Sequence, residues 1–240
     1  MHIHLQKRGI NLQLIARSKD KLEEISKDLT KKYGIEVKTI PLDLTKKESF
    51  KFLKETLIPS LILVNNVGGA QDSTFKYFEN YSPQEFSDMF DFNVYPTIFM
   101  TQICLQFMKE KKKGIILNMS SSASYVPYFL THYASSKWQI NTISKSLAYE
   151  YSSYGIITHN VMIGLVPTEA TIHIYKDNYP WYSSNGDSFA EDTLNKIGFG
   201  GHELFPTFKN FLLFSFVCSL PEKLRFLLLY QECKSKLEKI

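Results

Sequence analysis

The segment Tyr133-Ala-Ser-Ser-Lys137 places a phenol and an amine four residues apart. On an α-helix this spacing puts both side chains on one face, so the hydroxyl and the ammonium can reach into one pocket. A phenol with an ordinary pKa near ~10 is a weak acid or base at neutral pH. A neighbouring ammonium stabilises the phenolate and lowers its pKa towards the range useful for proton transfer. The pair therefore predicts acid–base chemistry, although the same spacing also occurs by chance on exposed helix faces.

Other polar residues upstream give this pair a context. An apolar run that ends at Met119 is followed by Ser120, Ser121 and Ser122. A serine at the carboxyl end of a parallel strand lies where open α/β sheets bind their ligands. Asn93 lies in a helical stretch, and a buried helical asparagine is costly unless its amide is hydrogen-bonded. It is expected either to hold a structural water or to take part in a proton relay.

Together with Asn65-Asn66-Val67-Gly68, these features resemble the short-chain dehydrogenase/reductase family over roughly residues 5–172. The resemblance implies that Tyr133 is the general acid/base and that Lys137 lowers its pKa and binds the nicotinamide ribose. It also implies that a serine orients the substrate carbonyl and that Asn93 holds the relay water. The family usually places the serine thirteen residues before the tyrosine, at Ser120, whereas the Asn-apolar-Ser-Ser motif favours Ser121. We take Ser121, with Ser120 as the alternative.

The resemblance also implies a set of residues that bind the cofactor. An acidic residue at the end of the second family strand would bind the two ribose hydroxyls of NAD, whereas Arg17 there favours the 2′-phosphate of NADP(H). A solvated arginine at a strand end is the alternative interpretation. The remaining positions follow from the family motifs: Asp43 for the adenine, Asn65, Val67 and Gly68 for the cleft, and Val166 and Thr168 for the carboxamide, besides Tyr133 and Lys137.

The beginning of the chain departs from the family. The family opens with a strand and a Thr-Gly-x-x-x-Gly-x-Gly loop, whose backbone amides approach the cofactor diphosphate, and neither is found here. Gly9 corresponds to the glycine before the second family strand, so residues 1–8 are expected to be the end of the first helix. The absence of a central strand predicts a gap in the sheet with unpaired backbone groups. The chain is either a truncated form of an intact enzyme or a degenerate paralogue.

The elements that must position these residues alternate between strands and helices, which is typical of a parallel sheet flanked by helices. We therefore expect an α/β, doubly wound, Rossmann-like fold with an apolar helical C-terminal extension. Ser82 with Glu85, and Thr45 with Glu48, predict capping boxes, and Asp20 marks a third helix start. The predicted strands are 11–16, 36–41, 61–65, 115–119 and 156–162, and the predicted helices are 19–33, 46–56, 82–111 and 132–153.

The alternation stops near Thr171. We expect residues 1–172 to form the dinucleotide-binding core and residues 173–240 to form a substrate-covering segment and apolar helices within the same domain. Residues 171–201 are rich in aromatics, Asn, Ser and Gly and are expected to form a substrate-covering segment without a regular layer. Within them, the aromatic-rich stretch 175–189, with Tyr179, Trp181 and Tyr182, is expected to cover an apolar substrate. The apolar segments 204–220 and 224–230 favour contact with a membrane surface or a partner slightly over a core position.

Composition excludes other classes of protein. The net charge is +4 and the basic residues are scattered, so no nucleic-acid-binding stripe is indicated. Cys104, Cys218 and Cys233 are far apart and show no metal-ligand spacing, and they are expected to be reduced structural thiols. No signal peptide opens the sequence, and no run approaches the ~20 apolar residues of a membrane-spanning helix.

We therefore expect an NADP(H)-dependent oxidoreductase that interconverts a ketone and a secondary alcohol on a hydrophobic substrate. The segments 9–22 and 32–34 resemble the branch of 17-beta-hydroxysteroid dehydrogenases and very-long-chain 3-oxoacyl-CoA reductases. That branch implies a steroid or a long-chain 3-oxoacyl-CoA as substrate and the cytosolic face of the endoplasmic reticulum membrane as location, with the cytoplasm as the alternative. A homodimer is compatible with the family. The competing hypothesis is a non-catalytic protein that acts through protein or membrane contacts.

Overall fold

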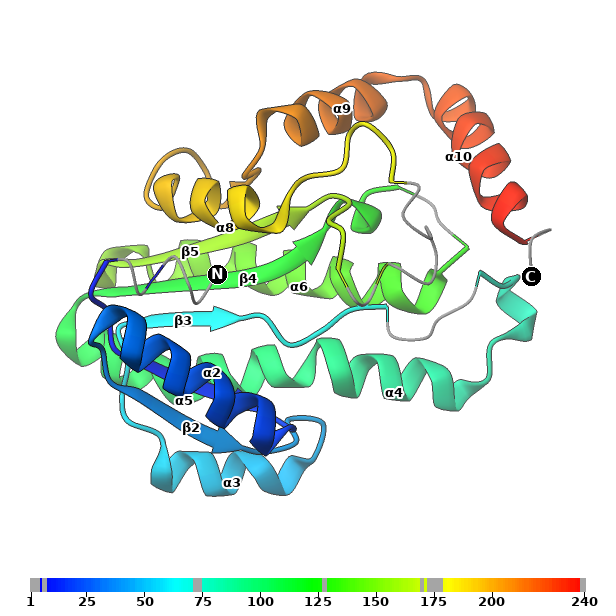
Figure 1. Cartoon of the computed structure of the whole chain (residues 1–240). Helices are drawn as coiled ribbons and strands as arrows, with labels where there is room; N and C mark the ends of the chain where they lie inside the picture. Colours follow the sequence, from blue (N-terminus) through cyan, green and yellow to red (C-terminus); the bar gives the residue numbers. More distant parts are fainter. Residues whose placement is uncertain are drawn as a thin grey trace.

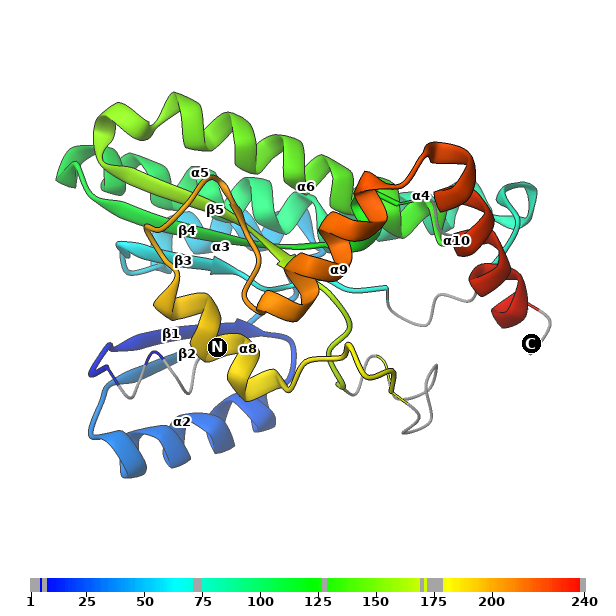
Figure 2. The same ribbon diagram turned by 90° about the horizontal axis from the view of Figure 1, so that it is seen from above.

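The computed structural model describes Leu5 and residues 8–70, 75–126, 129–168, 171 and 179–237, with backbone alone at 232 and 235–237. Its described part is an α/β fold with parallel strands and helices on both faces (Figures 1 and 2). The predicted α/β, Rossmann-like class with a parallel sheet flanked by helices is confirmed. The expected first helix at residues 1–8 lies outside the described residues, except for Leu5.

All five predicted strands are present, each within two residues of its predicted ends. The strands are β1 (Leu12–Ala16), β2 (Val37–Pro41), β3 (Ile62–Asn65), β4 (Gly114–Ser121) and β5 (Ile156–Ile163), with a short β6 (Glu203–Leu204). The sequence analysis missed β6, since two residues have no periodicity to detect.

The helices α2 (Lys19–Tyr33), α3 (Lys47–Thr56) and α6 (Thr131–Glu150) match their predictions closely. For two helices the residue predicted to mark the start is wrong, although the bounds agree. The hydroxyl of Ser18, not the carboxylate of Asp20, caps α2. Thr45 does not cap α3, because its amide and hydroxyl both donate to the Asp43 carboxylate, at 2.9 and 2.8 Å. The capping box of Ser82 and Glu85 is confirmed.

The predicted helix over 82–111 is two helices, α4 (Pro83–Asn93) and α5 (Tyr95–Lys111), divided at Val94. Pro96 lies in the first turn of α5 and has no N–H to donate to the carbonyl of residue 92. The helical hydrogen bonds therefore cannot run unbroken through this point, and Asn93 becomes the last residue of α4.

The segment predicted to be irregular contains a helix, α8 (Gly186–Asn195). Asn185 caps it by accepting hydrogen bonds from the amides of Asp187 and Ser188. Phe189 and Leu194 bury this helix on a core that includes Leu117 and Leu204. Tertiary burial and one capping residue thus stabilise this helix. The sequence did not indicate it, because the surrounding Asn, Ser and Gly residues are typical of irregular structure.

The sheet is divided, as the missing central strand predicted. Among the described residues, β1 pairs only with β2, while β3, β4, β5 and β6 form a second sheet in that order. A slot of about 650 Å3 separates the edges of β1 and β3 and is lined by side chains of both strands and of α2 and α5. The Gln13 side-chain amide connects β1 to the segment that leads into β3, because it donates to the carbonyl of Ile58 at 2.7 Å and accepts from the amide of Ile58 at 2.9 Å.

Helices cover the two faces of the sheets unequally. α4, α5 and α6 lie on one face, and α2 and α8 lie on the other (Figure 2). The helices α9 (Phe208–Ser219) and α10 (Glu222–Leu237) follow β6 and lie beyond the carboxyl ends of β4 and β5 (Figure 1). No helix among the described residues is long and apolar enough to cross a membrane.

Candidate active site

Strand β4 and helix α6 bring the predicted catalytic residues together. Tyr133 and Lys137 lie one turn apart on α6, and both line a cavity of about 610 Å3 together with Ser121 from the end of β4. The Ser121 side chain lies near enough to the Tyr133 hydroxyl to lower its pKa. Hence a hydroxyl acid and a second hydroxyl donor face the same space, which is what activation of a carbonyl oxygen requires.

The two candidate serines point in different directions. The Ser120 hydroxyl is buried and donates to the Asn141 side chain and, at 3.3 Å, to the carbonyl of Lys137. Successive side chains of a strand alternate in direction, so Ser121 does not share the contact of Ser120 with Asn141, and its side chain interacts instead with the Tyr133 hydroxyl. The geometry therefore favours Ser121 as the serine next to Tyr133.

Burial controls the electrostatics of the tyrosine and lysine. Burial raises the pKa of Tyr133, and the hydrogen bond from Ser121 lowers it only in part, so the net direction is upward. The sequence analysis predicted a lowered pKa, and in the described arrangement that direction is wrong. The Lys137 ammonium lies 5.9 Å from the centre of the Tyr133 ring and donates to the carbonyl of Met119 at 2.9 Å. Burial lowers the pKa of Lys137 itself to about 8.

Asn93 is 1% exposed and its amide is fully engaged within the protein. Its Oδ1 accepts from the amide of Gly69 at 2.7 Å, and its Nδ2 donates to the hydroxyl of Ser136 at 2.9 Å. Gly68 passes directly beside it, because a Cβ at Gly68 would lie 2.5 Å from Asn93 Oδ1 and 3.1 Å from Lys137 Nζ. Asn93 thus holds the loop after β3 against α6. These contacts are compatible with a structural role as well as with a role in a proton relay.

The residues assigned to the adenine end lie on the other sheet. Burial would raise the pKa of Asp43, but hydrogen bonds from Thr45 and the charges of Arg17 and Lys46 lower it overall. Arg17 is exposed and follows the end of β1, and Asp43 follows the end of β2. The two therefore lie close together at the carboxyl edge, with an arginine free to meet a phosphate.

Asn65 has a different environment from the one expected of a cofactor ligand. Its Nδ2 donates to Asn118 Oδ1 at 2.7 Å and to Thr101 Oγ1 at 3.1 Å, inside the sheet core. Val67 packs on the same core, and only Gly68 of the three lines the cavity near Tyr133. These contacts indicate that Asn65 stabilises the sheet and does not contact a cofactor directly.

The opposite wall of the cavity comes from the C-terminal third of the chain. Val166 and Thr168 line it, and the Thr171 hydroxyl donates to the carbonyl of Val166 at 3.0 Å. Tyr182 also lines it, whereas Trp181 is 76% exposed; residues 175–178 lie outside the described part. The apolar side chains that the sequence analysis did not assign to this wall are Phe205, Leu213, Phe214, Val217 and Leu229.

The cavity and the edge of β1 and β2 suit the two ends of a dinucleotide. Tyr133, Lys137 and Thr168 would hold the nicotinamide ribose and carboxamide, and Arg17 and Asp43 the adenosine phosphate end. Gly68 approaches Lys137 closely, and a Cβ at this position would block the approach. The absence of a side chain at Gly68 therefore leaves space at the nicotinamide end. Between the two ends lies the slot beside β1 and β3, where the described residues provide no glycine-rich loop for a diphosphate.

The sequence is similar to those of known proteins. A family model described as short chain dehydrogenase matches residues 1–178. The 17-beta-hydroxysteroid dehydrogenase type 3 of Homo sapiens is 34% identical over 200 residues, 82% of this chain and 63% of that protein. The very-long-chain 3-oxoacyl-CoA reductase of Bos taurus is 32% identical over 208 residues, 81% of this chain and 62% of that protein.

A solved structure gives the same picture. The alcohol dehydrogenase of Thermococcus sibiricus, complexed with 5-hydroxy-NADP, is 26% identical with a TM-score of 0.69, and the match covers 84% of this chain and 87% of that one. The chain spans little more than three fifths of the two curated relatives, at 63% and 62% of their lengths. With a family model that covers most of its length and a Tyr–Lys–Ser cluster at the expected place, the chain belongs to the short-chain dehydrogenase family.

Proposed function

We propose that this protein is an NADP(H)-dependent oxidoreductase that interconverts a ketone and a secondary alcohol on a hydrophobic substrate. The observation that carries the proposal is the convergence of Ser121, Tyr133 and Lys137 on one cavity with an apolar opposite wall. Steroids and long-chain 3-oxoacyl-CoA esters are the substrate classes we infer, because one relative is a 17-beta-hydroxysteroid dehydrogenase and another is a very-long-chain 3-oxoacyl-CoA reductase.

In this mechanism Tyr133 gives the proton from its Oη to the carbonyl oxygen. The phenol is protonated at neutral pH, as an acid in the direction of reduction must be. Because burial disfavours the phenolate that forms, proton transfer depends on stabilisation by the neighbouring Lys137 ammonium and the Ser121 hydroxyl. Ser121 donates a second hydrogen bond to the same oxygen, and Lys137 holds the ribose and supplies positive charge nearby. The bound cofactor supplies the hydride. The walls formed by α9 and Tyr182 exclude water from the reacting carbonyl.

The choice of NADP(H) rests on Arg17, an exposed arginine that follows the end of β1 and whose charge helps to lower the pKa of Asp43. The test is the binding of NADPH and NADH by calorimetry or by quenching of the chain's two tryptophans, Trp138 and Trp181. An Arg17→Ala variant should bind NADPH more weakly and NADH unchanged, whereas the neighbouring Lys19→Ala should change neither. Equal loss for both cofactors would refute the role of Arg17.

Turnover is tested with ketosteroids and 3-oxoacyl-CoA esters by following NADPH absorbance. Tyr133→Phe should lower kcat by about 100-fold or more, because general acid catalysis contributes at least that much. Tyr149→Phe is the matched control, since Tyr149 lies on the same helix and is 71% exposed. Retention of activity by Tyr133→Phe would refute the mechanism.

The slot between β1 and β3 favours a second candidate, a non-catalytic protein that acts through contacts with a partner or a membrane. The helices α9 and α10 present several exposed apolar side chains, and this surface suits a lipid interface or a second copy of the chain: Phe208, Leu212, Phe216, Phe226, Leu227 and Leu228. A folded sample that binds no NADPH but floats with liposomes would favour this candidate. The endoplasmic reticulum membrane is the location that we infer from the branch resemblance, and imaging of a tagged chain tests it.

A further inference from the structure

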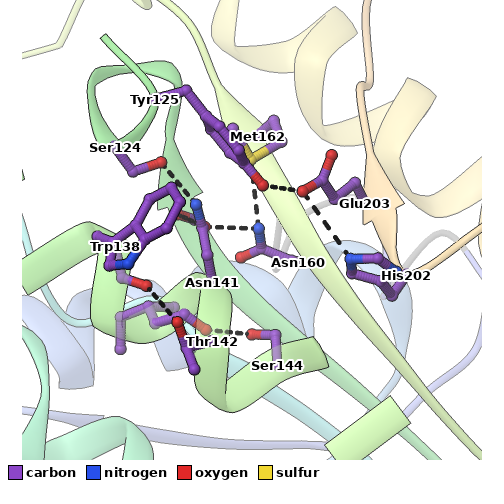
Figure 3. Close-up of polar contacts among 12 residues, drawn as sticks. Ser124, Tyr125, Trp138, Asn141, Thr142, Ser144, Asn160, Met162, His202 and Glu203 are labelled. Carbon is purple, nitrogen blue, oxygen red and sulfur yellow. Dashed lines mark hydrogen bonds and ion pairs between the residues drawn. The ribbon is translucent and has the colours of Figure 1, made fainter. Parts of the chain in front are cut away.

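Asn141 joins the catalytic helix to the end of the serine-bearing strand. It lies one turn beyond Lys137 on α6 and is 6% exposed. Its Oδ1 accepts from the Ser120 hydroxyl and, at 2.6 Å, from Asn160 Nδ2 on β5, and its Nδ2 donates to Ser124 Oγ at 2.7 Å (Figure 3). One side chain therefore connects α6, β4, β5 and the turn η2 (Ser122–Ser124).

Ser124 passes this connection on to Ser121. Its hydroxyl donates to the carbonyl of Ser121 at 2.6 Å, and the Ser121 hydroxyl accepts from the amide of Ala123 at 3.2 Å. A serine hydroxyl has one proton to donate, and Ser124 gives it to Ser121, so it meets Asn141 as an acceptor. This requirement fixes the orientation of the Asn141 amide, with its nitrogen towards Ser124 and its oxygen towards Ser120 and Asn160.

The far side of the turn is held independently. The Tyr125 hydroxyl donates to the Glu203 carboxylate of β6, and its ring packs edge-on against Trp138 and Phe214 (Figure 3). Loss of the Asn141–Ser124 bond should therefore shift the turn and leave it folded. The bond decides where the peptide of Ser121 lies relative to α6, which carries Tyr133.

We propose that Asn141 is a positioning residue of the active site, which acts through Ser124 to set the Ser121 hydroxyl against Tyr133. The proposal rests on the proposed function only for its kinetic test, because Ser121 and Tyr133 line the same cavity without substrate or cofactor. The competing explanation is that the buried amides merely satisfy one another in the core, as the pair of Asn118 and Ser144 does at 2.9 Å.

The experiment compares four variants of the whole chain. Asn141→Leu removes all three hydrogen bonds, and Ser124→Ala removes only the connection to Ser121. Ser124→Thr keeps a hydroxyl and serves as the conservative rescue. Ser144→Ala is the matched control, since Ser144 is fully buried on the same helix and its loss leaves Asn118 unsatisfied away from Tyr133. Each variant is measured for urea unfolding, for kcat and KM, and for the ¹³Cζ NMR resonance of Tyr133, which is assigned with Tyr133→Phe.

We expect Asn141→Leu and Ser124→Ala to lower kcat by about ten- to a hundredfold, the scale of a misplaced reacting group. KM for NADPH should stay unchanged, the Tyr133 resonance should move, and Ser124→Thr should restore both kcat and the resonance. Ser144→Ala should lower the free energy of unfolding without changing kcat or the Tyr133 resonance. If Ser124→Ala and Asn141→Leu behave like Ser144→Ala, the positioning role is refuted.

The NMR measurement separates this inference from the proposed function. If the unsubstituted chain reduces no ketone but the Tyr133 resonance moves in Ser124→Ala and returns in Ser124→Thr, the proposed function fails and the positioning role stands. If neither activity nor a change of the resonance is found, both fail.

Discussion

Replacement of Lys137 by methionine should stabilise the protein at neutral pH while it abolishes catalysis. Lys137 is 4% exposed, and burial lowers its pKa from 10.5 to about 8. At about 1.36 kcal/mol for each pH unit, this difference corresponds to roughly 3 kcal/mol of destabilisation in the charged form. Lys137→Met also removes the hydrogen bond to the carbonyl of Met119, which costs about 1 kcal/mol. The net expected gain at pH 7 is about 1–2 kcal/mol.

The gain should depend on pH with a defined sign. Because the folded-state pKa of this lysine lies below its unfolded value, the unfolded chain binds more protons between about pH 8 and about pH 10.4. The stability of the unsubstituted protein therefore rises with pH in that window relative to Lys137→Met. The advantage of the variant should shrink by up to about 1.36 kcal/mol per pH unit and then reverse.

The assay is urea unfolding of both proteins at intervals from pH 7 to pH 10, with the difference taken at each pH so that shared titrations cancel. Lys145→Met is the control, since Lys145 lies exposed on the same helix. The control should show no dependence of the difference on pH. A flat difference for Lys137→Met as well would mean that the Lys137 ammonium is solvated, and the reasoning from burial would be refuted.

Two further outcomes follow from the loop after β3 and from the slot. Gly68→Ala should lower stability by about 1–3 kcal/mol and reduce kcat, because φ at Gly68 is +139° and the new Cβ would lie 2.5 Å from Asn93 Oδ1; unfolding and turnover measurements check both effects. The rate of amide hydrogen exchange, followed by NMR, should alternate along β1, with Gln13 and Ile15 exchanging faster than Leu14. In the parallel pairing the N–H of Leu14 points towards β2, whereas those of Gln13 and Ile15 point towards the slot. Equal protection of the three amides would mean that the slot edge is paired in solution.

The strands and most helices could be predicted because their signals are local. An apolar run such as Ile62–Asn65, or a capping box such as Ser82 with Glu85, depends on a few neighbouring residues. The division at Val94 also has a local cause in Pro96, but the apolar residues on both sides concealed it. Helix α8 depends instead on burial of Phe189 against Leu117, which lies far away in the sequence.

The catalytic face was predictable for the same reason, and the opposite wall was not. Tyr133 and Lys137 lie one turn apart, so their common direction follows from helix geometry alone. In α9, apolar side chains occur on every face: Leu213 and Phe214 line the cavity, while Leu212 and Phe216 are exposed. A helix without a polar face carries no periodic signal that distinguishes substrate wall from surface.

The direction of the Tyr133 pKa could not be predicted because it depends on where the neighbouring groups finally point. A sequence shows that an ammonium is within reach of the phenol, but not that its hydrogen bond goes to the carbonyl of Met119. The sequence shows two serines. It does not show that the Ser120 hydroxyl donates to the Asn141 side chain while the Ser121 side chain interacts with Tyr133. The identity and spacing of residues in the sequence therefore predict which groups react. The buried polar contacts around these groups determine their protonation states and the directions of their side chains.

The divided sheet assigns the two halves of the proposed reaction to different parts of the fold. Ser121, Tyr133 and Lys137 all belong to the sheet of β3 to β6 and the helix packed on it, so their geometry does not require β1. Arg17 and Asp43 belong to the sheet of β1 and β2, which meets the other sheet across the slot through the side chain of Gln13. The affinity for a dinucleotide therefore depends on how firmly the two sheets are held together, while the arrangement of the acid and the carbonyl-binding serine does not. Loss of cofactor affinity in this chain would accordingly leave its catalytic cluster intact.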